Sequence, residues 1–384
     1  MLWFARAARA GAARAVALVL LIALAPGLVP APSAAGVGNP DISVIGQPFM
    51  RLTTEPEDPD RDRVQIDPGE VEVMFDAALN PYARGTIILA IGEEGLELEE
   101  GFFALTQGLP WRLALEGGQY RVGFGKMNPM HPHALPFSER FRVLANYLPG
   151  EEGFIEPGLS LSELVPLPGD RALTLAADWL QGDSFRRERE PGDDPDDPLN
   201  APDGPGDRAD ETRSAFAARA STFTLLGEES GLDLGVSFTH GTNNVAAGAR
   251  TTVAGADAKA KLKTAPESHL LLQGEVFQLW QDQAEWEPDG YVSSEVSPFG
   301  GYVYADYAFS RRYSAGGGYE RYEAPVPGEP AEHALKLFAG LSLLEESTYF
   351  TIDWDHFMPD GGEAIDTFTL RTVFALGPHK AHQF

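Results

Sequence analysis

Apolar and polar residues alternate with a period of two over many short segments of this chain, and such alternation predicts β-strands with one apolar and one polar face. The clearest segments are residues 70–79, 173–179, 232–239, 335–343, 350–355 and 368–376. In the last of these, Phe368, Leu370 and Phe374 share one face, and Thr369 and Arg371 share the other. A polar face of this kind suits the outside of a soluble sandwich or the wet lumen of a membrane barrel, so the period alone does not separate the two.

The connections between these segments alternate between short and generally longer links, and this regularity favours the barrel. The short links are 80–84, 108–110, 168–170, 228–231, 264–268, 310–312 and 345–347, and the longer ones are 55–65, 92–95, 124–157, 182–213, 243–251, 282–297, 324–332 and 358–365. They join about sixteen strands, within a range of about 14–18 because boundaries inferred from sequence are imprecise. The predicted fold is all-β: a transmembrane antiparallel β-barrel with short periplasmic turns and long outer loops.

Aromatic residues at the ends of several segments support the same fold. They are Trp111, Trp179, Trp280, Trp354 and Phe357. Aromatic girdles mark the two membrane interfaces of outer-membrane barrels, so we expect these side chains to lie there.

The N-terminal residues 1–35 have the pattern of a signal peptide, with the barrel in residues 36–384. Arg6, Arg9 and Arg14 form a basic region, Ala15–Ala25 is an apolar run too short to span a bilayer, and small residues follow. The chain has no cysteine, which excludes disulfides, thiolate metal sites and a cysteine nucleophile.

The formal net charge of −28 argues against nucleic acid as a partner, because binding to phosphates requires a basic surface. Much of the acid lies in the link 182–213, which we predict to be a disordered outer loop. The most concentrated part contains Asp193, Asp194, Asp196 and Asp197. The alternative to a purely solvated loop is that its carboxylates weakly bind divalent cations.

The link 124–157 differs from the acidic loop because it contains Phe137, Phe141, Leu144 and Tyr147. A long loop with such residues should fold onto another surface rather than extend into water. Sixteen strands leave an open aqueous channel, so we predict that this loop folds into the lumen as a constriction.

Four short segments resemble a family of proteobacterial outer-membrane barrels that are porin-like and often labelled zinc-regulated, TonB-dependent outer-membrane receptors. They are Asn39–Ser43, Gly123–His133 followed by Phe137, Gly182–Phe185 and His379–Phe384. The resemblance implies an outer-membrane barrel. In the family a Trp-Asp-Phe segment follows the His-x-His pair, whereas Ala134–Phe137 stands here.

The resemblance and the barrel pattern together suggest the partners. Outer-membrane lipids and lipopolysaccharide would contact the apolar face, and small solutes would enter the lumen. The C-terminal Phe384 is the type of residue that the barrel assembly machinery reads, although His382 and Lys380 precede it where apolar residues are usual. A homo-oligomer is a further possibility, for which the sequence identifies no contact.

His131 and His133 are candidate metal ligands, since imidazole nitrogens bind zinc when further ligands complete the site. Glu151 and Glu152 are the carboxylates that we expect to assist them. The alternative is a rigid proline-shaped turn in which the histidines only form hydrogen bonds, with no cofactor at all. The tail pair His379 and His382 is a weaker candidate of the same kind.

Charged residues are predicted to line the pore, because lysine on the lipid face is costly. They are Glu70, Glu72, Asp76, Lys259, Lys261, Lys263 and Arg371. The three carboxylates belong to the second predicted strand and the three lysines to the tenth, and these two strands lie opposite each other in a sixteen-strand barrel. The acidic and basic groups would therefore create a transverse electric field across the pore that orients dipolar solutes. The alternative is local pairing, of the lysines with Glu275 and Asp233 and of the carboxylates with arginines.

These features favour an outer-membrane channel for small hydrophilic solutes or ions. A specific receptor for zinc or another small ligand is the second hypothesis. A barrel hydrolase is the third, with Ser237, Thr239 and His240 near the end of one strand and Asp353, Asp355 and His356 near the end of another. No Gly-x-Ser-x-Gly motif or phosphate-binding loop is present, so we expect no enzymatic activity.

Overall fold

The computed structural model describes residues 39–92, 95–150, 153–169, 171–186, 211–287, 290–343 and 347–377. The predicted signal peptide (1–35), Glu151, Glu152, most of the acidic loop and the C-terminal tail with His379, His382 and Phe384 lie outside these residues. No helix within the described ranges is long and apolar enough to cross a membrane.

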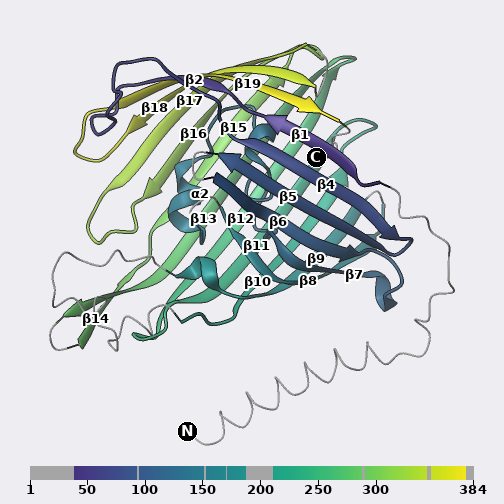
Figure 1. Ribbon diagram of the computed structural model, residues 1–384, viewed down its shortest axis with the longest axis horizontal. Coiled ribbons are helices and arrows are strands. Elements are labelled where there is room, and N and C mark those ends of the chain that lie inside the picture. The colour runs from purple at the N-terminus through teal and green to yellow at the C-terminus, as the bar shows by residue number, and fades with distance from the viewer. Residues whose placement is uncertain are drawn as a thin grey trace, which may run out of the picture. The chain divides into compact units, whose positions relative to one another are not determined.

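Within the described residues, nineteen strand segments form one antiparallel sheet that closes on itself. They are β1 (Asp41–Gly46), β2 (Phe49–Thr53), β3 (Gln65–Asp67), β4 (Val71–Asn80), β5 (Ala83–Gly92), β6 (Gly95–Leu105), β7 (Leu113–Arg121), β8 (Ile155–Leu167), β9 (Arg171–Leu180), β10 (Ala215–Leu225), β11 (Gly231–Asn244), β12 (Ala249–Ala265), β13 (Ser268–Glu287), β14 (Gly290–Val296), β15 (Phe299–Ala308), β16 (Tyr313–Glu323), β17 (Ala331–Ser342), β18 (Thr348–Met358) and β19 (Ile365–Leu376). Closure comes from β1, which pairs with β4 on one side and with β19 on the other, so the purple and yellow strands of Figure 1 meet.

Three pairs of segments are interrupted barrel strands. β1 and β2 both pair with β19, and their partners β4 and β3 form the next strand. β14 and β15 both pair with β13. The described segments therefore form a closed barrel of sixteen strands, which confirms the predicted fold class and count.

The alternation in the sequence corresponds to the two faces of the barrel. On β18, Thr351, Asp353 and Asp355 point inward and are buried, whereas Ile352 points outward and is 57% exposed. The same inward–outward pattern holds on β4, β9, β11, β17 and β19. Phe357 is an exception to the predicted aromatic girdle: it shares the inward face of β18 and packs against the buried cluster, with the Arg142 guanidinium 4.3 Å from its ring centroid.

One predicted loop is wrong. Much of residues 282–297 is a β-hairpin, in which the end of β13 pairs with β14 from Gln281↔Val296 to Glu287↔Gly290. The polar composition suggested a loop, but two strands that pair with each other satisfy their backbone hydrogen-bonding groups. Strand pairing can therefore continue through sequence that is too polar for a membrane.

The connection between β7 and β8, residues 122–154, is called the lumen loop below. It contains the short helices η2 (Pro132–Ala134) and α2 (Arg142–Tyr147). Phe124, Phe137 and Phe141 are at most 1% exposed and belong to a buried cluster that includes inward-facing residues of β13, β15, β16 and β17. The prediction that this connection folds into the barrel is confirmed.

Candidate functional site

The lumen loop is seated on an aromatic surface inside the barrel. Phe137 lies 5.4 Å from both Tyr304 and Phe338 between ring centroids, and Phe141 stacks on Tyr302 at 4.3 Å. Inward glycines make room for these rings: a Cβ on Gly318 would lie 2.7 Å from the Phe141 ring. An apolar seat of this kind is unusual for a wet lumen, and it fixes the loop by removing apolar area from water.

Charged groups on several strands bind the same loop. On β13, Glu275 accepts hydrogen bonds from the backbone N–H groups of Lys126 (3.0 Å) and Met127 (2.7 Å). On β16 and β18, Glu320 and Asp355 each lie 3.1 Å from the Arg142 guanidinium.

The predicted pore-lining residue Arg371, on β19, anchors the turn that carries the two histidines. Its guanidinium donates to the backbone carbonyls of Pro132 at 2.9 Å and Leu135 at 2.7 Å. Ser138, a few residues further along, donates its hydroxyl to Asp353 of β18 at 2.6 Å.

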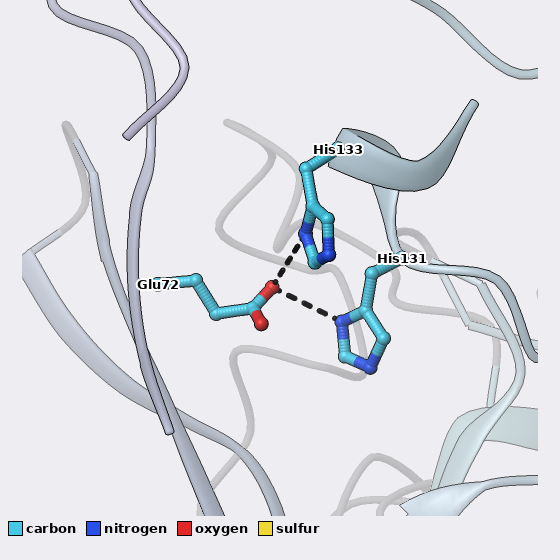
Figure 2. A group of neighbouring side chains, drawn as sticks. All are labelled: Glu72, His131 and His133. Carbon is cyan, nitrogen blue, oxygen red and sulfur yellow. Dashed lines mark ion pairs between the residues drawn. The ribbon is translucent and has the colours of Figure 1, made fainter. Parts of the chain in front are cut away.

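His131 and His133 flank Pro132 and point toward Glu72, which is on β4 (Figure 2). The Nδ1 atoms of His131 and His133 lie 3.1 and 3.2 Å from the same carboxylate oxygen, Oε2 of Glu72. One donor atom from each residue falls within 4.8 Å of the others, a spacing at which they could hold a metal ion. The structure thus brings the two predicted histidines together with a residue predicted only to line the pore.

Further carboxylates surround this group. Glu99 Oε2 lies 3.4 Å from Nδ1 of His131, and Glu100 Oε1 lies 3.1 Å from Nε2 of the same ring. Arg121 forms ion pairs with both of these glutamates. Burial opposes protonation of the ring, yet the neighbouring Glu100 and Glu72 carboxylates outweigh it and raise the pKa of His131.

Sequence reasoning missed Glu99 and Glu100, and the reason is a β-bulge. The register between β5 and β6 shifts between Ile88 and Leu89, where Glu100 pairs with Ile88 and Leu98 pairs with Leu89. Glu99 is the extra residue, so two successive glutamates are buried on the inner side. The two successive glutamates interrupt the alternation of apolar and polar residues along β6, and this interruption is the feature of the sequence that indicates a bulge.

The other two predicted acidic residues, Asp76 and Glu70, have different surroundings. Asp76 pairs with Arg84 and accepts a hydrogen bond from Thr86 at 2.7 Å. Glu70 belongs to a second group with Glu72 and Glu99, whose carboxylate oxygens lie within 4.8 Å of one another.

The three predicted lysines share the inward face of β12 but lie apart from the histidine group. Lys259, Lys261 and Lys263 line a cavity of about 380 Å³ together with His269 and Asp233. Lys263 Nζ lies 2.5 Å from Glu229, and Lys126 of the lumen loop lies 2.5 Å from Asp233. Local partners therefore exist for both charge sets, and the transverse field stays a prediction.

The residues considered for a hydrolase have other roles in the structure. The Ser237 hydroxyl accepts hydrogen bonds from Gly125 N–H at 3.1 Å and from Arg219 at 2.8 Å. His240 bonds to Thr252, and His356 lies 2.8 Å from Asp366. In the described part of the chain, these contacts pair Ser237 with Gly125 and Arg219 rather than with a histidine.

Comparisons with known proteins agree with the fold. No protein-family profile matches the chain. An uncharacterized protein of Aquifex aeolicus (strain VF5) is 26% identical over 334 residues, which cover 82% of this chain and 69% of that protein.

Solved outer-membrane structures are similar in backbone. The anion-selective porin from Comamonas acidovorans has a TM-score of 0.57 at 11% identity and covers 88% of this chain and 100% of its own. The outer-membrane channel DcaP of Acinetobacter baumannii has the same TM-score at 10% identity and covers 91% of this chain and 100% of its own. OmpF of Salmonella typhi, in complex with daunomycin, has a TM-score of 0.57 at 11% identity and covers 88% of this chain and 98% of its own. At such low identity, the similarity establishes the porin fold alone.

Proposed function

We propose that this protein is an outer-membrane channel for small hydrophilic solutes or ions, with the lumen loop as its constriction. The observation that carries the proposal is the seating of this loop inside a closed barrel, between inward charged walls. The outward apolar faces suit contact with outer-membrane lipids and lipopolysaccharide after export by a signal peptide and insertion by the barrel assembly machinery. The porin and channel names of the structural neighbours agree with this role.

Selectivity would come from the charges beside the loop. Carboxylates of β4 and β6 and the lysines of β12 face the interior on opposite sides of the sixteen-strand ring. Lumen charges select ions by attraction and repulsion at short range, where water screens them poorly.

Single-channel recording tests the proposal. The full-length processed protein would be inserted into planar bilayers in defined salt without any added partner, with heat-denatured protein as the control. We expect discrete conductance steps and uptake of small sugars in liposome swelling. A folded barrel that inserts but stays sealed to both salt and sugars would contradict the channel.

The second candidate is a specific receptor for a metal ion or small ligand, and the histidine–carboxylate group at Glu72 favours it. Such a receptor would be closed at rest and would bind its ligand from the outside. A sealed barrel that binds zinc would support the receptor, whereas an open pore would support the channel.

A further inference from the structure

The group of His131, His133 and Glu72 has the spacing of a metal site. Two ligands of a tetrahedral zinc ion are roughly 3.3 Å apart, given metal–ligand bonds of about 2.0–2.1 Å. The two observed nitrogen–oxygen distances, 3.1 and 3.2 Å, match this edge length. Both ring Nδ1 atoms also converge on one oxygen in Figure 2.

Among the residues that the structure describes, the atoms at this convergence are buried without a hydrogen bond of normal geometry. Nδ1 of His131, Oε2 of Glu72 and Oε2 of Glu99 are buried atoms that form no hydrogen bond of normal geometry within the described part of the chain. The Glu72 side chain is only 2% exposed and that of Glu99 only 4%. Buried carboxylate oxygens are normally hydrogen-bonded, ion-paired or bound to a metal. These oxygens lie 3.1–3.4 Å from the histidine rings, so either protonated histidines or a bound cation must balance their charge.

The local charge points the same way. Glu70, Glu72 and Glu99 bring carboxylate oxygens within 4.8 Å of one another, and Glu100 lies on the far side of His131. Arg121 pairs with Glu99 and Glu100 and offsets one of the four negative charges. A divalent cation would offset two more at the place where the carboxylates converge.

The carboxylate behind the His131 ring also suits a metal site. If Nδ1 of His131 binds an ion, its Nε2 carries the proton and can donate it to Glu100, 3.1 Å away. Carboxylate–histidine–metal arrangements of this kind fix the tautomer of a ligand and increase its basicity. Imidazole with a carboxylate suits zinc, copper, iron and nickel better than the hard ions calcium and magnesium.

The proposed ligands come from the lumen loop and from the barrel wall, so a bound ion would hold the loop against the wall. His131 and His133 are on the lumen loop, and Glu72 is on the wall. Arg371 already holds the turn from the β19 side. A cavity of about 230 Å³ is lined by Glu70, Pro132 and Arg371, which are neighbours of the group in sequence or contact.

We propose that Glu72, His131 and His133 bind a divalent transition-metal ion of the zinc class, which fastens the lumen loop to β4. Glu99 or water completes the coordination, and Glu100 orients His131. The ion acts as a removable fastener of the constriction rather than as cargo, so the loop moves more when the metal is absent. This role rests on the proposed channel, whereas the binding of the metal does not.

The competing explanation is a metal-free ion pair between protonated histidines and Glu72. Both explanations place charge on the same atoms, but they differ in what zinc does. A fixed ion pair leaves no measurable zinc site, whereas the metal site takes up one zinc ion per chain.

Calorimetry on the chelator-treated, full-length barrel in detergent, titrated with zinc chloride, tests the site. We expect one zinc per chain, at least about tenfold weaker binding in His131→Asn and Glu72→Gln, and a smaller loss in Glu100→Gln. His269→Asn, an inward histidine beside the lysines, is the control and should bind as the wild type does. Retained heat-modifiability on gels would show that each variant folds. Equal zinc affinity in wild type, His131→Asn and Glu72→Gln would overturn the site.

Single-channel recording with zinc and then with chelator tests the fastener. Open-channel current noise should rise on chelation in the wild type and in His269→Asn, but should not respond in Glu72→Gln. A zinc site with no effect on the current would overturn the fastener. If no variant conducts under any condition, the channel itself fails, while the calorimetric result still decides the metal site.

Discussion

Two neighbouring parts of the lumen loop meet the barrel in different ways. Around Phe137 and Phe141 the contact is apolar and tightly packed, with their rings against those of Tyr302, Tyr304 and Phe338. Around His131 and His133 the contact is made by charges and by the carbonyl groups that Arg371 holds. Apolar packing depends little on ions or pH, whereas contacts between charges depend on both. The first region would therefore hold the loop permanently, and the second would adjust it.

Removing an aromatic ring from the apolar seat should have the largest effect. Phe137→Ala should lower the free energy of unfolding by about 3–5 kcal/mol, because the ring is fully buried and leaves a cavity. Reversible urea unfolding in lipid, followed by tryptophan fluorescence, measures this. The control is Phe238→Ala on the outer face, which should cost clearly less. An equal loss in both variants would show that the seat contributes nothing special.

Weakening the polar attachment should have the next largest effect. Arg371→Lys keeps the charge but loses the fork that reaches both the Pro132 and Leu135 carbonyls. Hydrogen bonds of a charged donor contribute about 1.5–3 kcal/mol each, so we expect a loss of that order in the same unfolding assay. Arg250→Lys, at an exposed position, is the control. If stability and current noise match the wild type, Arg371 does not anchor the turn.

Adding a methyl group to the apolar seat should destabilise the barrel less than removing an aromatic ring from it. Gly318→Ala places a methyl group 2.7 Å from the Phe141 ring and 3.0 Å from Tyr304 Cβ, and overpacking of this kind costs about 1–3 kcal/mol. Gly92→Ala, where a Cβ meets nothing within 4 Å, is the control. A stabilised Gly318→Ala barrel would mean that the seat is looser than its distances indicate.

Reversing the basic side should change selectivity more than stability. Replacing Lys259, Lys261 and Lys263 by glutamate should raise the permeability for cations relative to anions in planar bilayers. The lysines line an open cavity rather than the packed seat, so we expect little loss of stability. Arg250→Glu, outside this cavity, serves as the control. An unchanged permeability ratio would exclude both the transverse field and any role of these lysines in selection.

The strands and the lumen loop could be predicted because each depends on a local pattern. A two-residue period defines the faces of a strand whatever its neighbours are, and Phe137 and Phe141 in a long loop require a surface to cover them. The misplaced Phe357 shows the limit: an aromatic residue at a strand end marks an interface only if its register places it outward.

The composition of the site could not be predicted in the same way. Glu72 meets the histidines because the lumen loop returns to β4, and nothing near either segment in the sequence specifies that contact. Glu99 and Glu100 reach the interior through one extra residue in β6, whose position depends on pairing with β5. The glutamates expected beside the histidines, Glu151 and Glu152, lie outside the described residues.

The meeting of β1 and β2 with β19 has a consequence for how the protein is made. The hydroxyl groups of Thr53 and Thr367 lie 3.0 Å apart across this seam, although 314 positions separate them in the chain. Synthesis of the N-terminal strand is finished long before its last partner exists, so the ring cannot be completed while the polypeptide is still emerging. Such distant pairing is slow, and two unpaired edges stay open to wrong partners until the end. The two edges that β1 and β19 later join are therefore the part of the nascent protein most exposed to mispairing until the final hairpins are made.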